Sequence, residues 1–500
     1  MTRADSRAGH QEWIGLAVLT LPALLASMDL SVLFMAAPWL AADLTPTGLQ
    51  LLWIMDVYGF LMAGLLLTMG ALGDRIGRRR LLLIGAAAFG AASVLAAYAP
   101  NAELLIAARA LLGIGGATLA PSTLALLRGM FADPAQRRAA IGVWTGAFTG
   151  GIAVGPIVGG LLLEHFWWGS VFLINVPVMA LLLVLGPVLL PEFRDPTQGR
   201  FDLMSALLSI TAVLSVVHSV KEFVHGGSAA LPALAGLVVG ALFVRRQLRL
   251  PDPLIDVRLF RDGGFSAAFG GYVMMIVGSA GLGYLAVQYL QVVLELRPFT
   301  AALWQLPTVA ATAIGIACAT SLVRRLRPAV LAGAALLVAA IGFLLVSRIE
   351  MDTGPAVMIT AYAVVTLGTG MLVPLAIDLI VSAAPAHRAG AAAGLSEAGS
   401  ELGGALGIAV LGSIAAAVYR SQFVPGELPP AETETVGGAL AAAESLPDAL
   451  RDALITSAQR AFTAGFTTAA TVMAALLAVT AAVVTIRLRR SGGTNGPPAR

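Results

Sequence analysis

The sequence predicts an all-α polytopic membrane protein with 14 transmembrane helices, grouped as six, two and six. Three observations predict this fold class: 58% of the 500 residues are hydrophobic, only 12% are charged, and the mean hydropathy is +0.87. Apolar runs of about 20 residues, enough for a helix to cross a bilayer, recur along the chain. The net charge of +3 indicates no nucleic-acid partner, because the basic residues lie in short segments between apolar runs.

Polar segments at 191–202 and 245–264 divide the predicted helices into three groups. A cytoplasmic tail (1–12) precedes a six-helix bundle (13–190), two inserted helices (203–247) follow, and a second six-helix bundle (265–487) leads to a cytoplasmic tail (488–500). The first apolar run is too long for the core of a signal peptide and is expected to be retained. The expected spans are 13–38, 49–70, 80–98, 102–128, 139–163, 168–190, 203–222, 229–247, 265–292, 299–322, 328–348, 355–382, 390–419 and 461–487.

The basic residues predict the orientation of these helices. With the N-terminus inside, 24 of the 31 lysines and arginines fall on cytoplasmic segments, six on outer segments, and Arg109 within the membrane. Positive charge gathers on the cytoplasmic side, so both termini are expected there. The Ala- and Arg-rich, lysine-poor composition fits a bacterial protein, and we expect it in the inner membrane, in contact with lipid. The outer segment 420–460 is expected to form either two short helices broken near Pro447 or a partly ordered polar loop.

The fifth predicted helix carries an unusual density of glycine, in GAFTGGIAVGPIVGG (146–160). Gly151, Gly155 and Gly159 are four residues apart, a spacing that lets two membrane helices approach closely, and Pro156 favours a kink. A dinucleotide-binding loop would need a preceding strand, which the sequence does not offer. We expect close packing where the two bundles meet, at Gly146, Gly151, Gly155, Pro156, Gly159 and Gly160.

Several stretches resemble one transporter family. GALGDRIGRRR (70–80) resembles the loop signature of the major facilitator superfamily, in which an aspartate and arginines could form a clasp that switches during transport. The superfamily's helix 4 motif resembles LLIAARALLGIGGATLAPS, which contains Arg109, and the antiporter motif of its drug exporters resembles the glycine stretch. MDLSVLFMAAPWL is similar to the helix 1 signature of its 14-helix drug:proton antiporters. KEF (221–223) resembles the quaternary-ammonium and methyl-viologen exporters of that subfamily. The resemblance implies the major facilitator fold, two six-helix bundles around a central cavity, with the two inserted helices between them. The switch residues it implies are Gly70, Gly73, Asp74, Arg75, Gly77 and Arg78.

Ionisable side chains within the membrane are costly and usually functional. Asp29, Asp56 and Arg109 are expected at similar depth towards the outside, and we assign them to proton coupling. An Asp29–Arg109 ion pair would place a carboxylate where a cationic ligand can compete for it. The alternative is an ion pair that only locks two helices.

Glu397 and Glu401 are one helical turn apart and share a face. Two carboxylates on one desolvated face do not readily both ionise, so the pair is expected to bind either a proton or a cationic substrate; the alternative is that Glu397 faces a cytoplasmic vestibule. We interpret Asp378 as an interfacial partner of Arg388, and Lys221 with Glu222 as a surface pair. Where related exporters carry an acid in helix 10 this chain has only Thr312, which puts dicationic substrates in doubt.

The energy source follows from what the sequence lacks. Its single lysine is not part of a phosphate-binding loop, so ATP hydrolysis is not expected, and neither a cofactor nor a metal site nor enzymatic chemistry is indicated. The membrane potential supplies ~2.3 kcal/mol per charge per 100 mV. The leading hypothesis is a proton-coupled antiporter that exports lipophilic, mainly cationic drugs and antiseptics. The alternatives are a dedicated exporter of one endogenous metabolite, antibiotic or lipid, and a receptor that does not transport.

Overall fold

The computed structural model describes residues 8–193, 202–224, 229–250, 253, 255–323, 325–383, 389–424 and 433–492. In these residues all regular structure is helical, as predicted. Thirteen helices are long and apolar enough to span a membrane, and two shorter apolar stretches lie at Ser31–Leu44, in the second part of α1, and Leu203–Ser219, in α8. The count of 14 spans therefore stays a prediction.

The first half of the chain forms one bundle, and local sequence sets the ends of its helices. Its elements are α1 (His10–Leu44), α2 (Gly48–Ile76), α3 (Arg78–Ala97), α4 (Ala102–Met130), α5 (Pro134–His165), and the short α6 (Ser170–Leu173) continued by α7 (Asn175–Leu189). Thr47 and Asn101 cap the starts of α2 and α4 by accepting backbone hydrogen bonds. Gly77, at φ +114°, makes the sharp turn between α2 and α3.

The remaining elements comprise the inserted pair and a second bundle. They are α8 (Leu203–Val224), α9 (Ala230–Arg249), η2 (Val257–Arg261), α10 (Gly263–Gln288) continued by η3 (Tyr289–Val293), α11 (Pro298–Trp304), α12 (Leu306–Leu322), α13 (Pro328–Val346), α14 (Pro355–Ala383), α15 (Ala389–Gln422), α17 (Val436–Ala443) and α18 (Asp448–Gly492). The expectation for the outer segment was partly wrong. One short helix, α17, precedes Pro447, but the second short helix is the beginning of α18, which contains no proline and continues unbroken.

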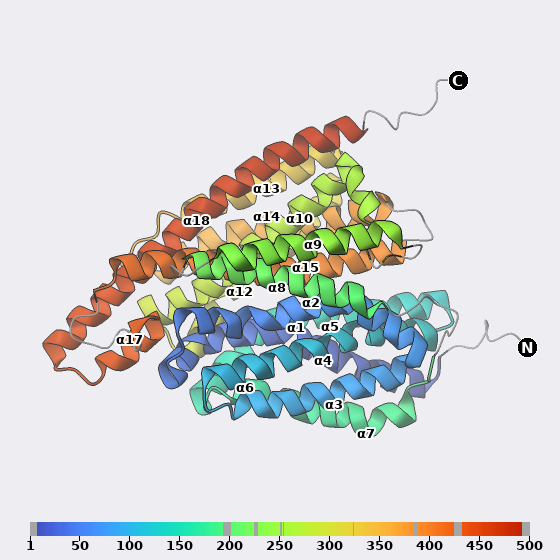
Figure 1. The fold of residues 1–500 in the computed structure, drawn as a ribbon, viewed down its shortest axis with the longest axis horizontal. Helices are drawn as coiled ribbons and strands as arrows, with labels where there is room; N and C mark the ends of the chain where they lie inside the picture. The colour runs from blue at the N-terminus through green and yellow to red at the C-terminus, as the bar shows by residue number, and fades with distance from the viewer. Residues whose placement is uncertain are drawn as a thin grey trace, which may run out of the picture.

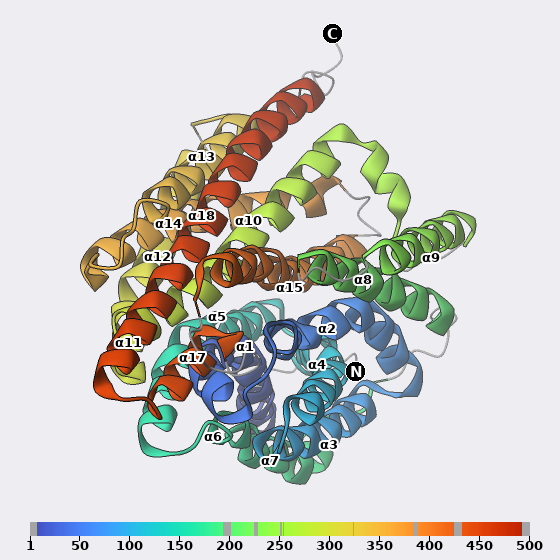
Figure 2. The ribbon, with the colours of Figure 1, turned by 60° about the vertical axis from the view of Figure 1, so that its left-hand side comes forward.

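The start of α1 and the end of α18 lie on the same side of the molecule, at the right in Figure 1. We call this side, predicted to be cytoplasmic, the inner end, and the opposite side the outer end. Figure 2 shows the first half, in blue to teal, below the second half, in yellow to red, with α8 and α9 to one side. In this arrangement α8 and α9 follow the first half along the chain and precede the second.

The two halves are joined most closely towards the outer end. A Cβ on Gly160 of α5 would lie 2.8 Å from the backbone of Phe299 in α11, and the Gln291 side-chain amide donates a hydrogen bond to the Met35 carbonyl of α1 at 3.1 Å. There α17 also packs on α1, with the Cβ position of Gly437 only 2.9 Å from the Pro38 carbonyl oxygen. At the inner part of α5, by contrast, a Cβ on Gly142, Gly146 or Gly150 would meet nothing within 4 Å.

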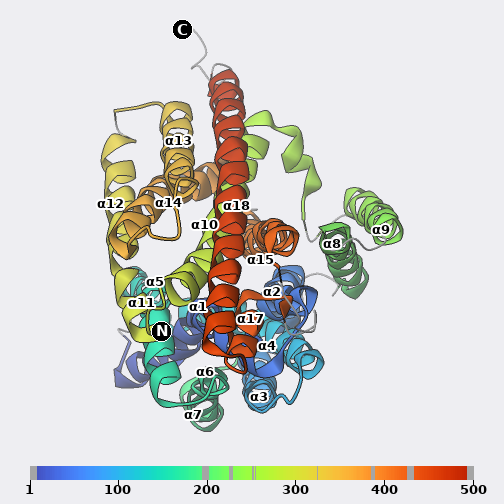
Figure 3. The same cartoon turned by 90° about the vertical axis from the view of Figure 1, so that its left-hand side faces the viewer.

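The inserted pair is fastened at both ends. At the inner end Arg246 of α9 pairs with Asp202, just before α8, at 2.8 Å, while at the outer end the Ser219 hydroxyl donates to the Ala229 carbonyl at 2.9 Å. Burial alone would raise the pKa of Asp202, but hydrogen bonds from Arg246 and Ser205 outweigh it and hold the pKa below its usual value. The pair therefore behaves as one unit, and α8 rather than α9 contacts α2 and α15 (Figure 3).

The glycine ladder of α5 packs against α1, within the first half, so the expectation that the ladder lies where the two bundles meet was wrong. A Cβ on Gly151 would lie 2.5 Å from the Leu24 carbonyl oxygen, a Cβ on Gly155 3.3 Å from the Met28 carbonyl oxygen, and one on Gly159 3.3 Å from the Val32 Cα. Pro156 is buried beside them, and only Gly160 touches the other half. Gly146 departs from the expected close packing. It is exposed, because it faces away from α1 at the open inner part of the helix.

Adjacent glycines in α5 provide a matched test of this packing. Gly151→Ala should destabilise the protein by about 1–3 kcal/mol, because a methyl group overpacks the α1 backbone. Gly150→Ala should be neutral or stabilising by up to about 1 kcal/mol, since alanine favours helix and nothing obstructs it. Thermal unfolding in detergent micelles measures both, and equal unfolding temperatures for the two variants would contradict the α1–α5 contact.

Candidate functional site

The deepest charge in the first half is the guanidinium of Arg109, on α4. Its side chain is 0% exposed and forms an ion pair with Asp29 of α1, while its Nε donates to the Ile54 carbonyl of α2 at 3.1 Å. The guanidinium carbon also lies 4.8 Å from the centre of the Tyr58 ring. The pairing expected between Asp29 and Arg109 is present in the structure, where it joins three helices.

Asp56 of α2 does not share that pair; its partner is Lys221 of α8. The Lys221 Nζ lies 2.8 Å and 2.7 Å from the two carboxylate oxygens, and both side chains are 0% exposed. The ammonium also lies 3.8 Å from the centre of the Trp53 ring. The interpretation of Lys221 and Glu222 as a surface pair was therefore wrong for Lys221. α8 packs against α2, which buries this position, and Glu222 lies beside His218 at 4.0 Å instead.

Glu397 and Glu401 of α15 lie on the side that faces the first half. A Cβ on Gly59 of α2 would lie 3.5 Å from the Glu401 carbonyl oxygen, and the charges that act on Glu401 are those of Glu397 and Asp29. The buried Tyr58 hydroxyl interacts electrostatically with both Asp29 and Glu401. No ion pair joins either glutamate to a basic side chain among the described residues. Of the two acids, Glu401 is the one on which the charge of Asp29 acts.

The predicted switch loop is held entirely within the first half. Asp74 accepts a hydrogen bond from Arg78 Nε at 2.7 Å, across the turn at Gly77. Glu192, which sequence reasoning missed, accepts hydrogen bonds from the backbone nitrogens of Arg79 and Arg80 at the start of α3, where the helix dipole favours an anion. Gly73 is buried against the Arg78 side chain, and a Cβ on Gly70 would lie 3.9 Å from the Cβ of Pro121. Arg75 is exposed. The switching role of these residues stays a prediction.

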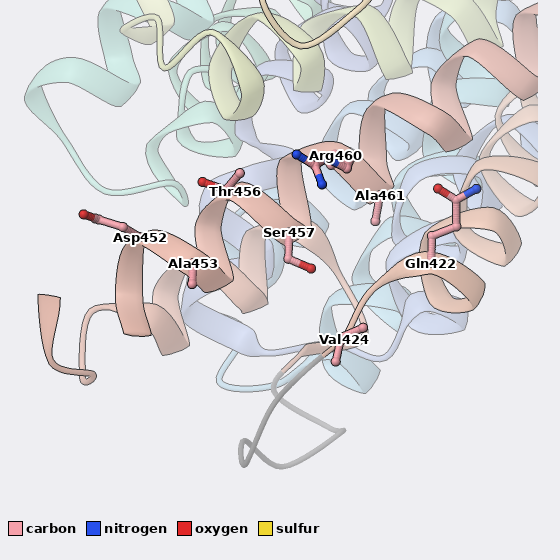
Figure 4. A pocket seen from close by; sticks show the side chains of 8 residues that line it. All are labelled: Gln422, Val424, Asp452, Ala453, Thr456, Ser457, Arg460 and Ala461. Carbon is pink, nitrogen blue, oxygen red and sulfur yellow. The ribbon is translucent and has the colours of Figure 1, made fainter. Parts of the chain in front are cut away.

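Two cavities open near the outer end, away from these charges. One of about 530 Å³ lies between the end of α15 and the first turns of α18, lined by polar side chains such as Asp452, Ser457 and Arg460 (Figure 4). The other, of about 680 Å³, lies beside α17.

Asp378 is exposed on α14, and its suggested partner Arg388 lies outside the described residues. The Thr312 hydroxyl donates to the Thr308 carbonyl at 2.9 Å.

Residues 19–408 match the family model of the Major Facilitator Superfamily. The chain is 45% identical over 497 residues to the multidrug efflux pump LfrA of Mycolicibacterium smegmatis, covering 98% of this chain and 99% of that protein. It is 35% identical over 446 residues to the methyl viologen resistance protein SmvA of Salmonella typhimurium, covering 87% and 90%. A crystal structure of a bacterial homolog of the human lysosomal transporter Spinster, described as inward-facing and unoccupied, has a similar fold, with a TM-score of 0.70 at 18% identity, covering 98% of this chain and all of that one.

Removal of one member of the Asp29–Arg109 pair should cost far more than removal of both. Arg109→Met leaves a buried carboxylate without its partner, which should lower stability by about 3 kcal/mol or more. Asp29→Asn combined with Arg109→Met removes both charges and should recover most of that loss. Thermal unfolding of the purified variants measures the difference.

Arg138→Met is the matched control, because Arg138 is exposed at the inner end of α5. It should unfold like the wild type. If Arg109→Met proved as stable as Arg138→Met, the buried ion pair would not be present in the membrane protein.

Proposed function

This chain belongs to the Major Facilitator Superfamily, and on that premise we propose that it is a proton-coupled antiporter that exports lipophilic, mainly cationic drugs and antiseptics. It is a multi-pass protein of the bacterial inner membrane and a transporter rather than an enzyme. Drug export is supported by its relatives, a multidrug efflux pump and a methyl viologen resistance protein. Proton coupling and cation selectivity are proposed from the charges inside the bundle.

The observation that carries the proposal is an imbalance of paired charge inside the bundle. Arg109 and Lys221 neutralise Asp29 and Asp56, whereas Glu397 and Glu401 have no basic partner among the described residues. Carboxylates in a low-dielectric surrounding must bind a proton or another cation. Glu397 and Glu401 can therefore alternate between a proton and a cationic substrate, which is the exchange that an antiporter performs.

The contacts between the halves support a direction of entry for each partner. The halves contact each other towards the outer end, so a lipophilic cation would reach Glu397 and Glu401 from the cytoplasm or the inner leaflet. Protons would arrive from outside, at Asp29, Asp56 and Arg109, once the outer contacts open. Because Asp29 acts electrostatically on Glu401, a proton that neutralises one acid changes the attraction that the others exert on the substrate.

Transport of tetraphenylphosphonium into proteoliposomes with an imposed pH gradient tests this proposal. The wild type should accumulate the cation only when the gradient is present. Glu401→Gln should weaken binding of the cation by about tenfold, or about 1.4 kcal/mol, because one of the two facing carboxylates becomes neutral. A flux that ignores the pH gradient would rule out antiport.

Asp378→Asn serves as the matched control, since Asp378 is an exposed acid on the neighbouring α14. It should transport tetraphenylphosphonium like the wild type, and equal transport by Glu401→Gln would contradict the assignment of Glu401 to the site.

Methyl viologen, a dication, provides a second probe. Thr312 stands where related exporters carry an acid, so methyl viologen should be accumulated less than tetraphenylphosphonium.

A further inference from the structure

A buried ion pair and apolar contacts join the inserted helix pair to the first bundle. Lys221 is the only lysine of the chain, it lies on α8, and its side chain and that of its partner Asp56 are both 0% exposed. A lysine in such a place is costly unless it is paired. Asp56 was assigned to proton coupling from its depth in the membrane, whereas Lys221 was interpreted as part of a surface pair. A costly ion pair inside the membrane, such as Lys221–Asp56, is usually functional.

α8 lies where the two halves meet. Val217, one turn before Lys221, packs in a small apolar cluster with Phe60 of α2 and with Ala405 and Ala409 of α15. The cluster gives α8 contacts to both halves, but the only ion pair that fastens α8 to either half among the described residues is the one to Asp56. α8 and α9 move as a unit, because Asp202–Arg246 and Ser219–Ala229 bind them to each other.

Other charges around Asp56 are few and come from several helices. Besides Lys221 they are Arg109 on α4, Tyr284 on α10, His218 and Glu222 on α8, and, facing the neighbouring Tyr58, Asp29 on α1 and Glu401 on α15. Arg109 is already held by Asp29. Lys221 is thus the cation that sets whether Asp56 keeps its negative charge.

We propose that Lys221 is a positioning residue for proton exchange, the counter-ion that holds Asp56 as a carboxylate until a proton replaces it. The proton adds to a carboxylate oxygen of Asp56, and Lys221 keeps its own proton. Its ammonium remains over the Trp53 ring, which lies 3.8 Å away and partly compensates the lost partner. Protonation of Asp56 then removes the ion pair between α8 and α2, while the apolar contacts of α8 with α2 and α15 remain.

This inference rests on the proposed function, because it requires that protons drive transport. It is tested with Lys221→Met, Asp56→Asn and the double variant, reconstituted in proteoliposomes that accumulate tetraphenylphosphonium under a gradient of one pH unit. Each coupled proton contributes about a tenfold accumulation per pH unit. All three variants should therefore lose the same factor of about ten, since each one leaves Asp56 unable to exchange a proton for Lys221.

Binding of tetraphenylphosphonium to each purified variant shows that it has folded, and the double variant removes the risk of a lone buried charge. Glu222→Gln, the next residue on α8, is the control and should accumulate the cation like the wild type. Wild-type accumulation by Lys221→Met, or its recovery in the double variant, would show that Lys221 is only structural. If the wild type itself showed no accumulation under the pH gradient, the proposed function would fail first.

Discussion

Every ionised side chain inside a membrane must be paired or neutralised, and this constraint organises the structure. Among the described residues, two basic groups are buried between helices, and each takes one acid: Arg109 takes Asp29, and Lys221 takes Asp56. The two pairs join α1 to α4 and α2 to α8. Glu397 and Glu401, on the opposite half, form no ion pair with a basic side chain in the part of the chain that the structure describes. In the proposed mechanism they are the acids that exchange a proton for a substrate.

The packing places these two kinds of charge against each other. Glycines on one face of α5 bring it against α1, the helix of Asp29, and the contacts at Gly160 and Gln291 hold the halves together towards the outer end. α2 carries Asp56 and Tyr58 towards α8 and α15. A change of charge at Asp29, Asp56, Glu397 or Glu401 therefore alters the electrostatic interactions where the two halves meet.

The sequence predicted the fold class, the two bundles and the Asp29–Arg109 pair, because hydropathy gives the spans and the position within a span gives depth. It did not predict the Asp56–Lys221 pair. Its position in the sequence placed Lys221 near the end of its helix, and the sequence does not show that α8 packs on α2. Glycine spacing identified the face at Gly151 but not the exposed position of Gly146, because spacing alone does not show which glycines contact a partner helix. Glu192 was missed because it comes from a segment distant in sequence from the helix start that it caps.

The central claim is that protons and a lipophilic cation compete for the same partly buried carboxylates, those of Glu397 and Glu401. Calorimetric titration of tetraphenylphosphonium into the purified protein, in buffers with different ionisation enthalpies, counts the protons released on binding. The account predicts release of about one proton per cation, with affinity rising as the pH rises. Binding without proton release, at an affinity independent of pH, would contradict it.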